Sequence, residues 1–315
     1  MTEQIDRNPL VSVIIPSYNH KPYVESAILS VLNQSYRNTE LIVIDDGSTD
    51  GSAEFLTELN KEHPFIFLSQ KNRGLSKTLN RGISMAKGSY LSLLASDDVF
   101  LPHKLETLVA AMEQSERDVA VVCGDAAFMD GDGHPVERAS GNNRYATFIN
   151  YYQAAFPAID IKGAFGSYRT LIYNNHIPAM SALMRRSAVE DIGLFSEDKA
   201  LEDWCLWLRM ARRFSIRYID DVVARYRVYE ANSSITLSMR LTLDALDLLD
   251  REKPFCVQRD CLREWRDNYY RTLFTLLEKG EIVRVLRRLR LRDIPSFLTH
   301  NFLRIISKRL GRNRR

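Results

Sequence analysis

Predicted strands and helices alternate four times over about the first 110 residues, with short polar connections between them. Short apolar runs at 10–15, 41–44, 65–68 and 90–94 predict buried strands, and a segment of helical periodicity follows each of them. Pro16 is expected to end the first strand. Such an alternation is typical of a mainly parallel sheet with helices on both faces. We therefore predict an α/β fold with a doubly wound sheet.

The rest of the chain is less regular. A fifth strand is predicted at 119–123, an irregular region follows at 125–180, and two separate extended pieces are predicted at 216–219 and 226–229. After about residue 236, only helical periodicity is found. We predict one large domain at 1–235, with halves at about 9–124 and 125–235, and a helical extension at 236–315.

Three polar clusters follow predicted strands, at Ser17–His20, Asp45–Ser48 and Ser96–Asp98. Ligands of such sheets bind at the carboxyl ends of the strands, so we expect the clusters to share one cleft. Asp97 and Asp98 place two like charges at one strand tip, and a divalent cation would remove their repulsion. Taken alone, Asp97-Asp98 is more often a helix cap, and Asp45–Ser48 is likewise a plausible cap and turn.

The basic residues are concentrated at the C-terminal end. Eleven of the 43 Lys and Arg but only two of the 40 Asp and Glu lie in 281–315, which gives that segment a net charge of +9 and the rest about −6. Arginines mix with leucines and isoleucines at helical spacing, which suits an anionic membrane surface. A solvated helix face is the alternative. Nucleic acid is not expected, because no recognition motif accompanies the charges.

No segment approaches the about 20 apolar residues of a membrane-spanning helix, and the first nine residues do not form a signal peptide. The four cysteines have no metal-ligand spacing, so reduced, buried thiols are expected. These features predict a cytoplasmic protein that rests on a membrane.

The ordered set of motifs resembles the family 2 glycosyltransferases, which have the GT-A fold, a Rossmann-like nucleotide-binding half included. The resemblance spans about residues 9–235. The matching stretches are Val11–Asn19, Asp45–Asp50, Asn72–Ser76 with Asn80, Gly88–Tyr90, Ser96–Asp98, Gly193–Phe195, Glu202–Trp204 and Tyr226–Arg227.

The resemblance implies a donor site in 9–124 and an acceptor site in 125–235. The donor would be a UDP-, GDP- or dTDP-sugar. Mg²⁺ or Mn²⁺ would be held by Asp98 and Asp97, since such cations prefer oxygen ligands. The residues implied to bind the donor are Pro16, Ser17, Tyr18, Asn19, Asp46, Gly47, Ser48, Arg73, Gly74, Lys77, Ser96 and Asp97.

The pair Glu202-Asp203 matches the acids that the family places beneath the acceptor. The resemblance implies an inverting transfer with Asp203 as the general base and Glu202 as the second choice. The alternative is that both acids stabilise a helix N-terminus through its dipole. Two positions depart from the family pattern: Ala95 stands where an acid is frequent, and Tyr229 stands where histidine is frequent.

The resemblance implies a saccharide acceptor that is lipid-linked, in lipopolysaccharide, O-antigen or capsule assembly, at the cytosolic face of the inner membrane. The aromatic residues of the irregular region would shape the acceptor pocket, or they would simply pack that region. His176 would bind the metal, or it would have a structural role. A nucleotidyltransferase and a degenerate sugar-nucleotide-binding scaffold are the alternative functions. A nucleotidyltransferase would favour a Gly-rich loop with a lysine after the first strand, which this chain lacks. The aromatic set is Tyr145, Tyr151, Tyr152, Phe156, Phe165, Tyr168 and Tyr173.

Overall fold

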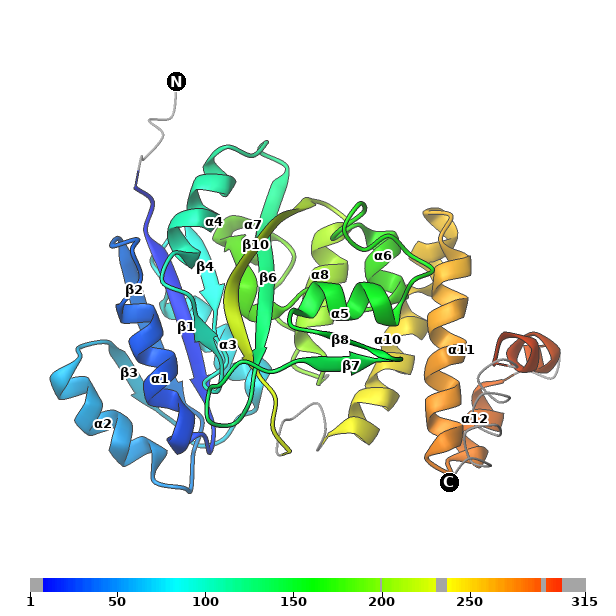
Figure 1. Ribbon diagram of the computed structural model, residues 1–315, viewed down its shortest axis with the longest axis horizontal. Helices are drawn as coiled ribbons and strands as arrows, with labels where there is room; N and C mark the ends of the chain where they lie inside the picture. The colour runs from blue at the N-terminus through cyan, green and yellow to red at the C-terminus, as the bar shows by residue number, and fades with distance from the viewer. Residues whose placement is uncertain (1–7, 199, 231–236, 290–292, 302–315) are drawn as a thin grey trace. The chain divides into compact units, whose positions relative to one another are not determined.

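The computed structural model describes residues 8–198, 200–230, 237–289 and 293–301 (Figure 1). The chain divides into two compact units. Unit 1 comprises Met1–Tyr168, His176–Asp198 and Glu202–Tyr229, and unit 2 comprises Arg169–Asn175, Lys199–Leu201 and Glu230–Arg315, as far as these residues are described.

Unit 1 is built on an eight-stranded mixed sheet. Strands β3, β2, β1 and β4 are parallel, β9 lies antiparallel between β4 and β6, β10 is parallel to β6, and β5 is antiparallel to β10. A separate hairpin pairs β7 with β8. In sheet order the strands are β3 (Ile66–Ser69), β2 (Thr39–Asp45), β1 (Val11–Ser17), β4 (Tyr90–Leu93), β9 (Ala182–Arg185), β6 (Val119–Met129), β10 (Ser215–Arg227) and β5 (Val99–Phe100), and the hairpin is β7 (Arg138–Ser140) and β8 (Asn143–Tyr145).

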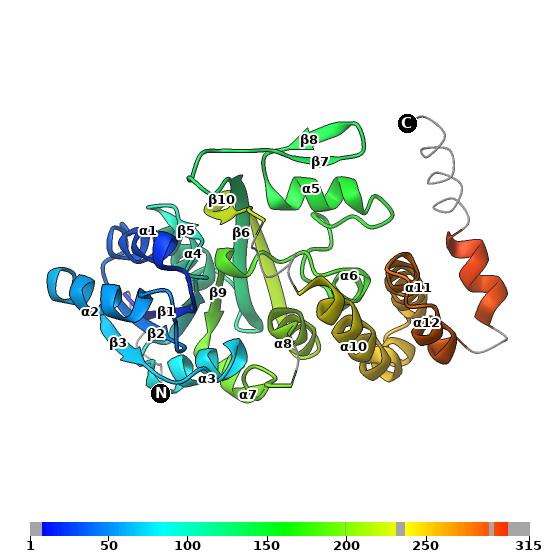
Figure 2. The same cartoon turned by 90° about the horizontal axis from the view of Figure 1, so that it is seen from below.

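Helices cover both faces of the sheet, with α1 and α4 on one face and α3 and α7 on the other (Figure 2). Side chains alternate across β1: Val11, Val13 and Ile15 pack in one core cluster with residues of α1 and α4, whereas Ile14 contacts α3. The helices are α1 (Lys21–Leu32), α2 (Ser52–Glu62), α3 (Leu75–Met85), α4 (Lys104–Glu113), α5 (Phe148–Ala155), α7 (Arg186–Asp191) and α8 (Glu202–Ala211), with the 3₁₀ turn η1 (Ala179–Ser181).

The predicted fold class, a mainly parallel α/β sheet followed by helices, is confirmed, with three local corrections. Pro16 lies inside β1 and pairs with Ile44, because a residue near the strand end can lack an N–H donor. The fifth strand continues to Met129. The two pieces predicted at 216–219 and 226–229 are one strand, β10, whose polar middle contains register shifts that interrupt the apolar pattern.

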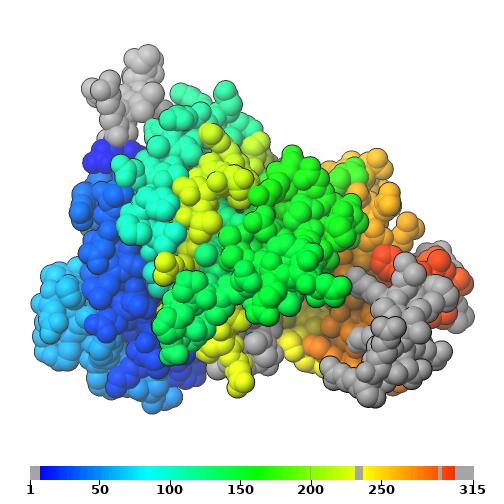
Figure 3. Space-filling view, in the orientation of Figure 1, coloured from blue at the N-terminus to red at the C-terminus, as the bar shows by residue number. Residues whose placement is uncertain are grey.

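The segment with β7, β8 and α5 belongs to the irregular region predicted at 125–180. It forms a continuous green surface in the space-filling view (Figure 3). Asp125 of β6 fixes the start of α5, because its Oδ1 accepts a hydrogen bond of 2.9 Å from the N–H of Ile149. The irregular region is thus anchored to the central sheet.

Unit 2 is helical in the part that the structure describes. Its helices are α10 (Ser238–Gln258), α11 (Leu262–Glu278) and α12 (Ile282–Arg288), together with most of α6 (Tyr168–Tyr173) and a helical segment at 294–301. The indole Nε1 of Trp265 donates to the carbonyl of Leu249 at 2.6 Å and joins α11 to α10. None of the described helices combines the length and the apolar composition needed to cross a membrane.

Candidate functional site

Asn19 joins the end of β1 to the loop after β2. Its backbone has a positive φ of 55°, a conformation that asparagine tolerates better than most residues. The N–H of Asn19 donates to Ser48 Oγ at 2.9 Å, and Asn19 Oδ1 accepts from the N–H of Thr49 at 2.8 Å. Two of the predicted polar clusters therefore meet here, with the Tyr18 ring exposed beside them.

The carboxylate of Asp46 organises the loop 70–74. Its Oδ1 accepts from Gln70 Nε2 at 2.8 Å and from the N–H of Arg73 at 2.9 Å, and its Oδ2 accepts from the N–H of Gly74 at 2.9 Å. Gly47 follows with a φ of +78°, and a Cβ there would lie 2.7 Å from the backbone nitrogen of Asn72. The Asp46 side chain is buried beneath this loop, whereas the side chains of Arg73 and Lys77 are exposed.

Two buried polar atoms at this edge have no hydrogen-bond partner among the described residues: Ser17 Oγ and Asp45 Oδ1. These residues are register partners at the carboxyl ends of β1 and β2. The other carboxylate oxygen of Asp45 accepts from the N–H groups of Gly47 and Ser48 at 3.2 Å. Because buried polar groups are normally paired, the two orphaned atoms mark a place where a polar ligand group fits.

Asp97 and Asp98 follow β4 in a turn closed by a 3.0 Å bond from the N–H of Asp98 to the carbonyl of Ala95. Asp98 is 1% exposed, and its Oδ1 accepts from the N–H of Arg227 at 2.9 Å. Asp97 Oδ2 accepts from the hydroxyl of Tyr229 at 3.0 Å. Burial, together with the charge of Asp97, raises the pKa of Asp98 well above its ordinary value.

His20 was predicted as the last member of the first polar cluster, but it was not assigned a role in the site. Its Nδ1 lies 2.8 Å from Ser96 Oγ and its Nε2 lies 3.2 Å from Tyr229 Oη. His20 therefore links the first and third polar clusters, so that all three clusters are brought together as predicted. The signal in the sequence was the position of a polar ring beside the Pro16–Asn19 motif.

Arg227 is a second residue that the sequence analysis did not assign to the site. Its Nε donates to the carbonyl of Asp97 at 2.7 Å, and its Nη1 donates to the carbonyls of Asp130 and Gly131 at 3.1 and 2.7 Å. The guanidinium lies 4.7 Å from the ring centre of Tyr23. Arg227 thereby ties the tip of β4 to the turn that follows β6.

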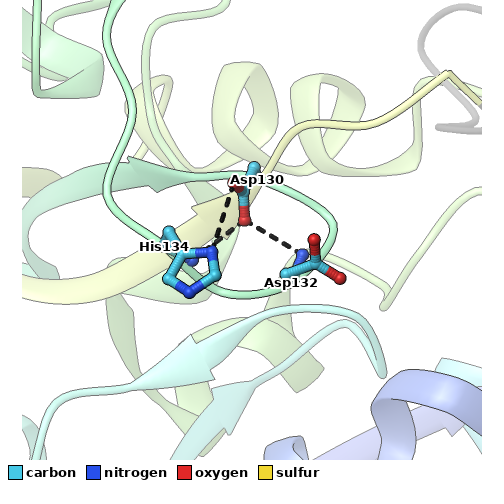
Figure 4. Close-up of side chains that lie close together, drawn as sticks. All are labelled: Asp130, Asp132 and His134. Carbon is cyan, nitrogen blue, oxygen red and sulfur yellow. Dashed lines mark hydrogen bonds and ion pairs between the residues drawn. The ribbon is translucent and has the colours of Figure 1, made fainter.

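That turn carries Asp130, Asp132 and His134, whose potential ligand atoms lie within 4.8 Å of one another (Figure 4). Asp130 Oδ1 already accepts from the N–H groups of Asp132 and His134, both at 2.9 Å. These bonds are those of a side-chain-capped turn, and Asp132 and His134 are exposed. The grouping is explained by the turn, and we assign no metal site to it.

Glu202 and Asp203 begin α8, as predicted. Asp203 Oδ1 accepts from the N–H of Trp204 at 2.6 Å. Burial and the charge of Asp203 raise the pKa of Glu202 to about 8. The charge of Asp203 also contributes to the raised pKa of the Tyr152 phenol, for which burial is the main cause. In the described part of the chain, neither Asp97 nor Asp98 has a hydrogen bond to this acidic pair.

The predicted acceptor aromatics separate into different groups. Tyr152 stacks on Phe148 with ring centres 4.5 Å apart, and Tyr151 and Phe156 pack against Tyr152. The remaining members lie elsewhere: Phe165 stacks on Tyr218, Tyr145 is on β8, and Tyr168 and Tyr173 are on α6. His176 is fully buried against the Phe165 ring and accepts from the N–H of Gly166 at 3.4 Å, which supports its structural interpretation.

Comparison with known proteins gives the context of this site. Residues 12–193 match the family model described as glycosyl transferase family 2. The uncharacterized glycosyltransferase RP339 of Rickettsia prowazekii is 32% identical over 231 residues, which are 73% of this chain and 67% of the relative. The putative teichuronic acid biosynthesis glycosyltransferase TuaG of Bacillus subtilis is 29% identical over 231 residues, 72% of this chain and 82% of the relative.

Among solved structures, the fold is similar to that of the mannosyltransferase PcManGT from Pyrobaculum calidifontis, which was determined in complex with GDP-Man and Mn²⁺. The TM-score is 0.64 at 17% sequence identity, and the match covers 95% of this chain and 81% of the other. The likeness identifies the fold as GT-A.

Proposed function

Because this chain belongs to glycosyl transferase family 2, we propose that it transfers a sugar from a nucleotide-diphosphate-sugar donor to a saccharide acceptor with inversion at the anomeric carbon. The observation that carries the proposal is the meeting of the three polar clusters at the carboxyl edge of β1, β2 and β4. This edge is where sheets of this type bind their ligands.

The nucleotide is proposed to lie between the Asn19–Ser48 corner and the loop held by Asp46. Asp46 fixes the backbone of Arg73 and Gly74, and the exposed side chains of Arg73 and Lys77 supply positive charge for the phosphates. The orphaned oxygens of Ser17 and Asp45 support a polar ligand at the same edge. A UDP-, GDP- or dTDP-sugar satisfies these requirements.

Asp97 and Asp98 are the proposed residues for Mg²⁺ or Mn²⁺. The fit rests on two adjacent carboxylates, of which Asp97 keeps its Oδ1 without a hydrogen bond from any described residue. Asp97 and Asp98 would hold the cation where its positive charge would neutralise charge on the departing nucleoside diphosphate. Asp98 is more buried and bonded to Arg227, so we propose that Asp97 is the principal ligand.

Asp203 is the proposed general base, which takes the proton from the acceptor hydroxyl as the new glycosidic bond forms. Its Oδ1 bond to the N–H of Trp204 orients the carboxylate at the start of α8. Burial and the charge of Asp203 raise the pKa of Glu202, which makes Glu202 the weaker candidate for the charged base. The aromatic group of Phe148, Tyr151 and Tyr152 is the proposed wall of the acceptor pocket.

The acceptor is proposed to be a lipid-linked saccharide in cell-surface polysaccharide synthesis, in line with the teichuronic acid assignment of TuaG. Ile282, Val283 and Leu286 of α12 are more than half exposed, and the segment that follows is rich in arginine. We propose that this basic, apolar surface rests on the cytosolic face of an anionic membrane.

The function is tested by incubating the full chain with a panel of UDP-, GDP- and dTDP-sugars, with and without Mn²⁺. Release of a nucleoside diphosphate from one donor, lost in Asp97→Ala, is the expected result. A nucleotidyltransferase would instead consume a nucleoside triphosphate and a sugar phosphate and release pyrophosphate. Donor binding without turnover, in the presence of a broad acceptor mixture, would indicate the scaffold alternative.

A further inference from the structure

Four side chains from three strand ends form one hydrogen-bonded chain that ends on Asp97. Ser96 Oγ lies 2.8 Å from His20 Nδ1, His20 Nε2 lies 3.2 Å from Tyr229 Oη, and Tyr229 Oη lies 3.0 Å from Asp97 Oδ2. His20 follows β1, Ser96 and Asp97 follow β4, and Tyr229 follows β10. The chain of bonds therefore joins β10 to the paired strands β1 and β4, neither of which is its neighbour in the sheet.

With a neutral imidazole at His20, the chemistry of the four groups allows one direction for these bonds. An ionised carboxylate only accepts hydrogen bonds, so the hydroxyl of Tyr229 donates to Asp97. That hydroxyl has one proton, so its oxygen accepts from His20 at Nε2–H. A neutral imidazole then has its lone pair at Nδ1, which accepts from the hydroxyl of Ser96. Every donor in the chain points toward Asp97.

The surroundings hold Tyr229 in place. Its ring centre lies 5.1 Å from that of Tyr23, which in turn lies under the guanidinium of Arg227. Arg227 itself is bonded through its backbone N–H to Asp98 and through its Nε to the carbonyl of Asp97. Arg227 at the end of β10 thus binds the backbone of Asp97, and Tyr229 just after β10 binds its side chain.

We propose that Tyr229 and His20 are positioning residues that hold Oδ2 of Asp97 and thereby present its Oδ1 to the cation and diphosphate of the donor. The proposal rests on the proposed function, since it needs a donor that carries a diphosphate and a cation. It also gives Tyr229 a role different from that of a metal ligand, because its hydroxyl proton is engaged by Asp97 and its oxygen by His20.

The first test measures Mn²⁺ binding to the full chain by electron paramagnetic resonance of the free ion, with GDP or UDP present. Loss of a residue that orients a metal ligand typically weakens metal binding by about 10- to 100-fold, which is the expected range for Tyr229→Phe. Tyr23→Phe is the matched control, because it removes a hydroxyl from the same aromatic group without touching Asp97, and it should bind Mn²⁺ as the wild type does.

The second arm tests whether His20 acts through Tyr229. His20→Ala should weaken Mn²⁺ binding in the wild-type background and have no further effect in Tyr229→Phe. Full additivity of the two losses would overturn the shared role, and unchanged Mn²⁺ binding in Tyr229→Phe would overturn the proposal. Thermal unfolding followed by circular dichroism identifies a variant that has lost its fold, in which case His20→Gln replaces His20→Ala.

A third measurement needs neither metal nor donor. Nitrogen-15 NMR of histidine side chains at about pH 8 should show His20 as the Nε2–H tautomer, assigned among the six histidines by its absence in His20→Gln. An Nδ1–H tautomer would contradict the hydrogen-bonded chain itself. If the wild type shows the expected tautomer but binds no Mn²⁺, the proposal that Tyr229 and His20 present Asp97 to a cation is refuted. Donor turnover without metal would in that case still support the proposed transferase function.

Discussion

Asn80 of α3 and Phe195 hold each other through a reciprocal pair of hydrogen bonds. Asn80 Nδ2 donates to the carbonyl of Phe195 at 3.0 Å, and the N–H of Phe195 donates to Asn80 Oδ1 at 2.9 Å. Both residues belong to stretches of the family pattern, and they lie 115 positions apart. The pair attaches the segment before α8 to α3, the helix that follows the loop 70–74, and α8 itself begins with the proposed catalytic acids.

Replacing Asn80 by alanine should therefore destabilise the protein. The substitution leaves the N–H and carbonyl of Phe195 without these partners, and an unsatisfied buried group costs about 1–3 kcal/mol. Urea denaturation should show a free energy of unfolding lowered by that amount. Ser84→Ala on the exposed side of the same helix is the control and should stay within about 0.5 kcal/mol of the wild type. Equal stability of both variants would contradict the structural role of Asn80.

Asp203→Asn should abolish most of the transfer while donor binding is kept. A positioned general base contributes about 10²- to 10⁴-fold to a rate, so kcat should fall in that range. The measurement is product formation under saturating donor, with nucleotide affinity from calorimetry as the control. Glu202→Gln should retain much more activity, and a larger loss in that variant than in Asp203→Asn would exchange the two roles.

The raised pKa of Glu202 predicts a pH-dependent stability. Its ordinary value of 4.5 rises to about 8 in the folded protein, so between these values the folded state binds more protons than the unfolded state. The free energy of unfolding should therefore fall as the pH rises from about 4.5 to about 8 and then level off. Urea denaturation at several pH values in this window should show that the free energy of unfolding of Glu202→Gln depends less steeply on pH than that of the wild type. An identical pH dependence of the free energy of unfolding in both proteins would contradict the raised pKa of Glu202.

Asp46→Asn should weaken nucleotide binding, because the carboxylate holds the backbone of the loop 70–74. The carboxylate accepts three hydrogen bonds on two oxygens, and an asparagine must turn an NH₂ group toward one of the donors. A lost charge-assisted bond corresponds to about 1.5–3 kcal/mol, or at least tenfold in affinity. Asp50→Asn, in the same loop after β2 as Asp46, is the control for calorimetric titration, and comparable losses in both variants would argue against a specific role of Asp46.

The exposed apolar residues of α12 predict vesicle binding. Replacing Ile282, Val283 and Leu286 together by asparagine should reduce co-flotation of the full chain with vesicles of anionic lipid, because it removes the surface that would enter the lipid interface. Val257→Ser on α10, another exposed apolar position of unit 2, is the control and should float as the wild type does. Deletion of 281–315 should have the strongest effect, and unchanged flotation after deletion would exclude membrane attachment through this segment.

The sheet and its functional edge could be predicted because the strands before residue 95 are short, mainly apolar runs, and because β1, β2 and β4 are each followed by a polar cluster. The same local reasoning failed for β10, since the exposed acids Asp220 and Asp221 interrupt its pattern while the backbone stays extended. It also gave no information on which strand pairs with the edge of β4 that faces away from β1. That neighbour is β9, which comes from about 90 residues later in the chain.

The contacts that define the site most sharply were also invisible in the sequence. His20, Tyr229 and Arg227 act through side-chain geometry that depends on the assembled sheet, and their spacing along the chain exceeds any local motif. Asp97 and Asp98 are adjacent in sequence and were both predicted as metal ligands. The structure gives them different surroundings, because one carboxylate binds a tyrosine hydroxyl and the other is buried against a backbone N–H.

The antiparallel strand β9 has a consequence for the order of events during synthesis. β4 pairs with β1 on one side, but its other edge is completed only by Leu91 and Tyr90 pairing with Met184 and Arg185. On the ribosome, strands β1 to β4 emerge long before residue 185, so this edge stays unpaired while about 90 more residues are translated. Unpaired edges recruit other strands. A nascent chain arrested near residue 120 should therefore bind chaperones, and extension beyond β9 should release them.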